Sequence, residues 1–198
     1  MEITWLGGSA LLLKGRETRV LLDPAYQKDG ALANSTAEIV VSPAGGENVL
    51  TPAKGPQVIA RQGEYELRGV SVRGVMTAGG TLFVTEVDEV AVCDFGEFSG
   101  PLEVEALDAI GTIDVLALSL QKGSPSRAVE VAALVSQLQP SVLLPVGFQA
   151  SGDESPGELA EFAKEMGLTQ TSAQAKLTLA GSPGISDDTR VVILEARR

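Results

Sequence analysis

Short apolar runs, broken by turn residues, dominate the first half of the chain. The runs are four to six residues long, rich in Val, Ile and Leu, and separated by Gly, Pro, Asp or Asn. This pattern is typical of β-strands. It predicts strands at residues 2–5, 9–14, 18–22, 38–42, 57–60, 65–68, 70–75, 81–86 and 89–93. Two of the breaks, Gly15-Arg16-Glu17 and Val87-Asp88-Glu89, are short enough to predict β-hairpins.

Helical spacing begins in the second half. Apolar residues at positions 128, 131, 132, 135 and 138 predict a helix that opens at Ser124-Pro125. Ser155-Pro156-Gly157-Glu158 matches a capping box with Pro at the first helical position, and the helix it opens is expected to end at Gly167. A weaker helix is expected at 102–110. Further strands are predicted at 114–118 and 141–145, which are nearly continuous apolar runs, and in the tail at 175–179 and 190–194.

Hairpin strands followed by alternating strands and helices predict two sheets packed face to face, with helices outside. Periodicity alone leaves the α/β and α+β classes open. The chain has 198 residues, of which 44% are hydrophobic and 4% aromatic. That length and composition predict one domain, residues 1–198, with an aliphatic core.

Charge and cysteine content narrow the function classes. The formal net charge of −11 disfavours nucleic acid and anionic membranes as partners. The sequence has no apolar run long enough for a membrane span, and its start MEITWLGG does not resemble a signal peptide. Cys93 is the only cysteine, so no internal disulfide can form, and we expect a buried core residue in a cytoplasmic protein.

Several segments, in order along the chain, resemble the small Zn-dependent hydrolase branch of the metallo-β-lactamase fold. The opening Trp5–Ala10 resembles W-L-G-H-S, and Leu22-Asp23-Pro24 resembles L-I-D-P. The stretch AEIVVSPAGGEN at 37–48 resembles the metal-binding loop A-D-x-V-x-[ST]-H-x-H-x-D-H. The later matches are to G-E-Y-E at 63–66, L-G-D-L-G-H around 93–97, the strand D-V-L at 114–116, and L-x-P-x-x-x-I-P-x-H-Y at 139–148. The resemblance spans nearly the whole chain. It implies an αββα sandwich, in which two mixed β-sheets pack face to face with helices on the outer faces.

The same resemblance implies where zinc ligands would lie. In that family, imidazoles and carboxylates hold zinc, and the metal activates a water for hydrolysis. Only the bridging aspartate is intact in this chain, as Asp94, and a glutamate replaces the loop aspartate. The family's ligand positions fall on Gly8, Pro43, Gly45, Glu47, Asn48, Ala78, Asp94 and Gly147.

The chain contains no histidine, so the family's zinc site cannot form whatever the alignment. We therefore expect no zinc cofactor and no catalytic residue, and interpret the chain as a catalytically inactive binding or scaffold module for an unidentified small molecule or protein. Imidazole positions that became glycine predict a polar pocket, and whether Phe148, Phe95 or Gln149 refills it stays open. An alternative is a hydrolase with a rebuilt oxygen-ligand site for Mg²⁺, Mn²⁺ or Ca²⁺ on Asp94, Glu47 and Asp23. The competing interpretation makes Asp94 and Asp23 structural, through hydrogen bonds with backbone N–H groups.

Overall fold

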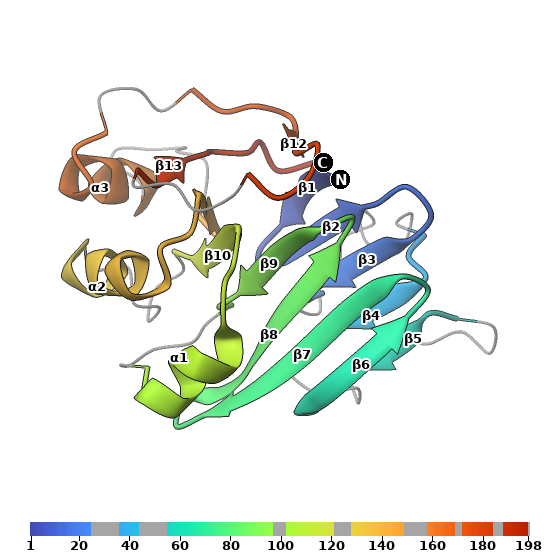
Figure 1. The fold of residues 1–198 in the computed structure, drawn as a ribbon. Helices are drawn as coiled ribbons and strands as arrows, with labels where there is room; N and C mark the ends of the chain where they lie inside the picture. The colour runs from blue at the N-terminus through green and yellow to red at the C-terminus, as the bar shows by residue number, and fades with distance from the viewer. Residues whose placement is uncertain are drawn as a thin grey trace.

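Two β-sheets face each other in the structure, which is a computed structural model (Figure 1). It describes residues 1–24, 36–43, 55–96, 102–120, 128–148, 158–168, 172–183 and 188–197. The two mixed sheets and their accompanying helices confirm the predicted α/β sandwich.

The first sheet has the strand order β12-β1-β2-β3-β4-β5. Strands β1, β2 and β3 pair antiparallel, and β3, β4 and β5 pair parallel, so the sheet is mixed. Its strands are β1 (Glu2–Gly7), β2 (Ala10–Lys14), β3 (Arg19–Leu22), β4 (Ile39–Val41), β5 (Gln57–Ile59) and β12 (Leu177–Thr178).

The second sheet has the order β13-β11-β10-β9-β8-β7-β6. Strands β6 to β9 form an antiparallel meander, and β9, β10, β11 and β13 are parallel. Its strands are β6 (Gly63–Leu67), β7 (Val70–Thr77), β8 (Gly80–Val87), β9 (Val90–Asp94), β10 (Val115–Ser119), β11 (Val142–Val146) and β13 (Arg190–Val191).

The described helices are α1 (Val104–Ile110), α2 (Ala128–Leu138) and α3 (Glu158–Glu165), and they lie along the second sheet (Figure 1). The predicted helices at 102–110 and 124–138 and the one before Gly167 are confirmed where the structure describes them. The starts expected at Ser124-Pro125 and Ser155-Pro156 lie outside the described residues.

Alternation of side chains explains where the core lies. On β1, β2 and β3 every second residue faces the second sheet, and these side chains join one aliphatic cluster with residues of the second sheet and the helices. Burial of this shared surface is the main force that holds the sheets together. A smaller cluster of Leu6, Ala10, Leu21 and Val40 occupies the other face of the first sheet.

The meander is closed by tight turns. Asp88 and Glu89 both have positive φ, of 50° and 65°, as do Arg68 and Gly69 at 52° and 72°. Two successive positive φ values mark the type I′ turn that matches the twist of a hairpin. The hairpin predicted at 87–89 is confirmed, as is the one at 15–17, where β2 pairs antiparallel with β3.

Candidate functional site

The carboxyl ends of the parallel strands meet at one edge of the molecule. In the second sheet, Ser119 N donates to Gly96 O (3.3 Å), and Leu120 N donates to Val146 O (2.8 Å), so the residues after β9, β10 and β11 lie side by side. In the first sheet, Asp23 N donates to Val41 O (2.8 Å) where β3 and β4 end. Such edges commonly hold the ligand sites of open sheets.

Asp23 and Asp94 come together at this edge, one from each sheet. Gly96 lies between them: its N–H donates to Asp94 Oδ1 (3.0 Å), and a methyl group placed on Gly96 would lie 3.3 Å from Asp23 Oδ2. Asp94 is 3% exposed and Asp23 is 8% exposed. The structure therefore brings together two of the three predicted oxygen ligands. The third, Glu47, lies outside the described residues together with Gly45 and Asn48.

The environment of Asp94 favours its protonated form. Burial is the main cause, the nearby negative charge of Asp23 adds to it, and together they raise the pKa of Asp94 to about 8 despite the hydrogen bond from Gly96 N–H. A carboxyl group with this pKa carries a proton at neutral pH. The hydrogen bond from Gly96 agrees with the structural interpretation of Asp94, because a backbone N–H satisfies one of its buried oxygens.

Asp23 is held by its backbone in a conformation unusual for a residue with a side chain. Its φ is 38°, in the left-handed region. Ser9 Oγ donates to the Asp23 carbonyl oxygen (3.3 Å), and the Asp23 N–H is bonded to β4. This strained residue lies at the same edge as Asp94, where strained backbone often accompanies a function.

An aromatic pair lies beside Gly8 and Gly147, the glycines at two of the predicted ligand positions. Trp5 Nε1 donates to Gly8 O (2.8 Å), and the Trp5 and Phe148 ring centroids are 4.5 Å apart. Gly8 and Gly147 have φ of 55° and 71°, a region that suits glycine far better than histidine. Phe148 is 8% exposed, so it packs into the interior beside Gly147.

The donor set at this edge does not fit zinc in the family manner. The whole sequence lacks histidine, and Pro43 and Ala78 offer no side-chain donor at two further positions that the sequence analysis predicted for ligands. Cys93 precedes Asp94 in β9, so its side chain points to the opposite face of the sheet. Within the described ranges, no group of three or more Asp, Glu, Cys or His side chains is arranged to hold a metal ion.

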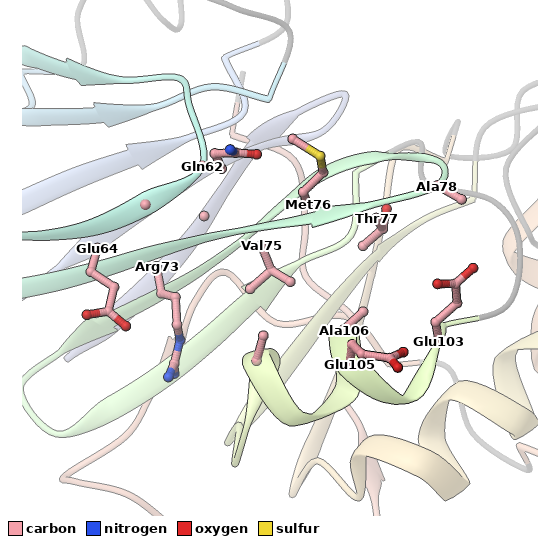
Figure 2. A pocket seen from close by; sticks show the side chains of 13 residues that line it. Gln62, Glu64, Arg73, Val75, Met76, Thr77, Ala78, Glu103, Glu105 and Ala106 are labelled. Atoms are coloured by element: carbon pink, nitrogen blue, oxygen red, sulfur yellow. The ribbon is translucent and has the colours of Figure 1, made fainter.

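A separate cavity of about 470 Å³ lies between β6, β7 and α1 (Figure 2). Arg73 pairs with Val84, and Val84 pairs with Cys93, so Arg73 shares the face of Cys93 and not that of Asp94. The cavity is thus on the outer face of the second sheet. Of the predicted ligand positions that the structure describes, Ala78 alone lines it.

Sequence reasoning missed this cavity. The run Val70-Ser71-Val72-Arg73 alternates apolar and polar residues, which predicts that Arg73 faces solvent on a half-buried strand. The available signal was the expected helix at 102–110, but nothing in its spacing indicates that it covers β7.

Comparison with known proteins defines the class. Residues 2–147 match the beta-lactamase superfamily domain. Because this match covers well over half of the chain, the chain belongs to that superfamily. A search of curated proteins finds no matching sequence. None of the helices in the described part of the chain has the length and apolar character needed to cross a membrane.

Solved structures share the fold. A Thermotoga maritima protein described as a Zn-dependent hydrolase of the metallo-beta-lactamase superfamily has a TM-score of 0.75 and 25% identity, over 98% of both chains. Igni18, a metallo hydrolase from Ignicoccus hospitalis, has a TM-score of 0.62 and 16% identity, over 97% of this chain and 94% of its own. YhfI from Bacillus subtilis, a metallo-beta-lactamase fold protein, has a TM-score of 0.61 and 10% identity, over 98% of this chain and 97% of its own.

Proposed function

We propose that this chain is a catalytically inactive member of its superfamily that binds a small molecule or a protein. The observation that carries the proposal is the absence of histidine from the whole sequence. Proteins of the same fold are described as metal-dependent hydrolases. Zinc activation of water needs several neutral or anionic donors that converge on one ion. Here the retained carboxyl, Asp94, is buried and favours its protonated form.

The positions that lost their donors support the same proposal. Gly8 and Gly147 occupy left-handed backbone, and Phe148 packs on Trp5 next to them. Restoring a histidine at either glycine would place a β-carbon in a strained conformation. We infer that the backbone of this edge is now adapted to packing and not to metal coordination.

A second candidate function follows from the proximity of Asp23 and Asp94. Two buried carboxyl groups on either side of Gly96 could hold Mg²⁺, Mn²⁺ or Ca²⁺ through oxygen, with Glu47 as a further candidate ligand. Metal binding would then release the Asp94 proton, so the affinity would rise steeply with pH up to about 8.

Thermal shifts with single divalent ions separate the two candidates. If the chain is an inactive superfamily member, its melting temperature should show no saturable shift with Mg²⁺, Mn²⁺, Ca²⁺ or Zn²⁺. A ligand raises the melting temperature only by binding the folded state. The oxygen-ligand site predicts a shift of the melting temperature that grows from pH 6 to pH 8, as Asp94 loses its proton more readily. The shift should be lost in Asp94→Asn. The exposed Asp108→Asn on α1 is the matched control, and it should behave like the unmodified protein. A shift lost equally in both variants would contradict a site on Asp94.

A further inference from the structure

The cavity between β6, β7 and α1 has an arginine, Arg73, at one end (Figure 2). Arg73 Nη2 donates to Ile110 O at the end of α1 (3.3 Å), whereas Arg73 Nε is buried without a hydrogen-bond partner. An unpaired buried donor destabilises the fold, and more so when it is charged. Among the described residues no carboxylate lies within salt-bridge distance of this guanidinium. The position therefore lacks an acceptor that can reach Nε and a neighbouring Nη.

Acidic side chains lie at both ends of the same cavity. Glu64 is directly opposite Arg73 in the β6–β7 ladder, and Glu103 and Glu105 line the cavity from the start of α1. Figure 2 shows Arg73 and Glu64 on one side of Val75 and the two helix glutamates on the other. One arginine and three glutamates give this lining a formal charge of −2.

The middle of the cavity is apolar. Val75 and Ala106 are each 6% exposed, and Ala109 also contributes to the lining. Figure 2 shows that Arg73, Val75 and Thr77 point toward α1, whereas Gln62 and Met76 point away from it. The order along the cavity is thus a guanidinium with a carboxylate, then an apolar stretch, then two carboxylates.

We propose that this cavity binds a basic α-amino acid such as lysine. The α-carboxylate accepts a bidentate pair of hydrogen bonds from Arg73 Nε and Nη, the geometry that guanidinium groups favour. The α-ammonium lies by Glu64, the methylene chain covers Val75 and Ala106, and the terminal ammonium lies by Glu103 and Glu105. The cavity volume of about 470 Å³ is within the range of small-molecule sites.

The proposal names a ligand class and a place for the binding function proposed above. The place is independent of the Asp23–Asp94 edge, because the cavity lies on the opposite face of the second sheet from Asp94. Zinc-dependent turnover would overturn the inactive assignment and leave the cavity untouched. Failure of lysine to bind would overturn the cavity proposal and leave the inactive assignment in place.

Isothermal titration with three matched probes tests the charge pattern. L-lysine should bind saturably below about 10 mM. L-norleucine lacks the terminal ammonium and should bind about two- to tenfold more weakly, because exposed carboxylates contribute modestly. Cadaverine lacks the α-carboxylate and should bind at least about tenfold more weakly, since the contact with Arg73 is charge-assisted and partly buried. Equal affinity for all three probes, or no saturable binding of lysine, would overturn the proposal.

Two variants locate the site. Arg73→Gln should weaken lysine binding at least about tenfold, whereas Arg16→Gln, at an exposed arginine of the β2–β3 turn, should leave it unchanged.

Because Arg73 also bonds to the end of α1, its loss could unfold the chain. Ala109→Phe avoids that problem, since Ala109 is exposed and the phenyl ring of the variant fills the cavity. It should abolish binding with unchanged melting, and Ala132→Phe on exposed α2 surface is its control. Wild-type affinity in folded Ala109→Phe protein would overturn the proposed site.

Discussion

Replacing Asp94 with asparagine should remove a pH-dependent loss of stability. The pKa of Asp94 is raised from 3.8 to about 8 in the folded chain, mainly by burial and then by the charge of Asp23. Between these two values the folded state holds a proton that the unfolded state has released. The free energy of unfolding therefore falls as the pH rises through this window, and the loss is complete above pH 8.

The size of the effect follows from the shift. A difference of about four pKa units corresponds to an upper limit of ~6 kcal/mol. Local relaxation and water entry reduce the cost of a buried charge, so we expect ~3 kcal/mol. Asparagine keeps the oxygen that accepts the Gly96 N–H and has no charge to lose. The variant should match the unmodified protein near pH 3.5, below both pKa values, and exceed it in stability near pH 9 by roughly that amount.

Urea unfolding at several pH values between 3.5 and 9 measures this difference directly. Asp108→Asn, on the exposed face of α1, controls for the loss of one negative charge and should follow the wild-type pH dependence. Parallel curves for the wild-type protein and Asp94→Asn across the whole range would refute the reasoning, because they would mean that Asp94 ionises in the folded chain as it does in the unfolded one.

Three further perturbations test other parts of the fold. Cys93 is fully buried and burial raises its pKa, so the native protein should resist a thiol reagent at pH 8 and react fully once unfolded; rapid native reaction would contradict its placement. Gly74→Ala would place a β-carbon 2.7 Å from Arg61 O, so unfolding measurements should show a loss of about 1–3 kcal/mol, and unchanged stability would contradict the close approach. The Arg19 guanidinium, bonded to Glu38, lowers the pKa of that carboxyl, so Glu38→Gln should cost under about 1 kcal/mol at neutral pH, and the difference should vanish on acidification. A cost that persisted at low pH would show that the charge is not its source.

The strands were predictable because side-chain alternation and turn residues specify them locally. The break at Asp88-Glu89 predicts a hairpin, and the structure closes it with two positive φ values. The apolar runs that became β10 and β11 are buried along their whole length, as the sequence predicts for parallel strands covered on both faces.

The two sites were harder to predict because they depend on contacts between distant segments. Asp23 follows β3 in the first sheet and Asp94 ends β9 in the second, and no local spacing indicates that Gly96 lies against both. Arg73 occupies a polar position on an alternating strand, which predicts exposure to solvent. Only the packing of α1 beside β7 encloses its guanidinium and creates the cavity.

Metal content combined with turnover tests the assignment of an inactive superfamily member most directly. The purified protein would be loaded with Zn²⁺, dialysed and analysed by plasma mass spectrometry, and the same sample assayed against ester, lactone and phosphodiester substrates with and without a chelator. We predict substoichiometric zinc and no chelator-sensitive hydrolysis, because no imidazole is present to hold the ion. Stoichiometric, tightly held zinc together with hydrolysis that the chelator abolishes would contradict the assignment.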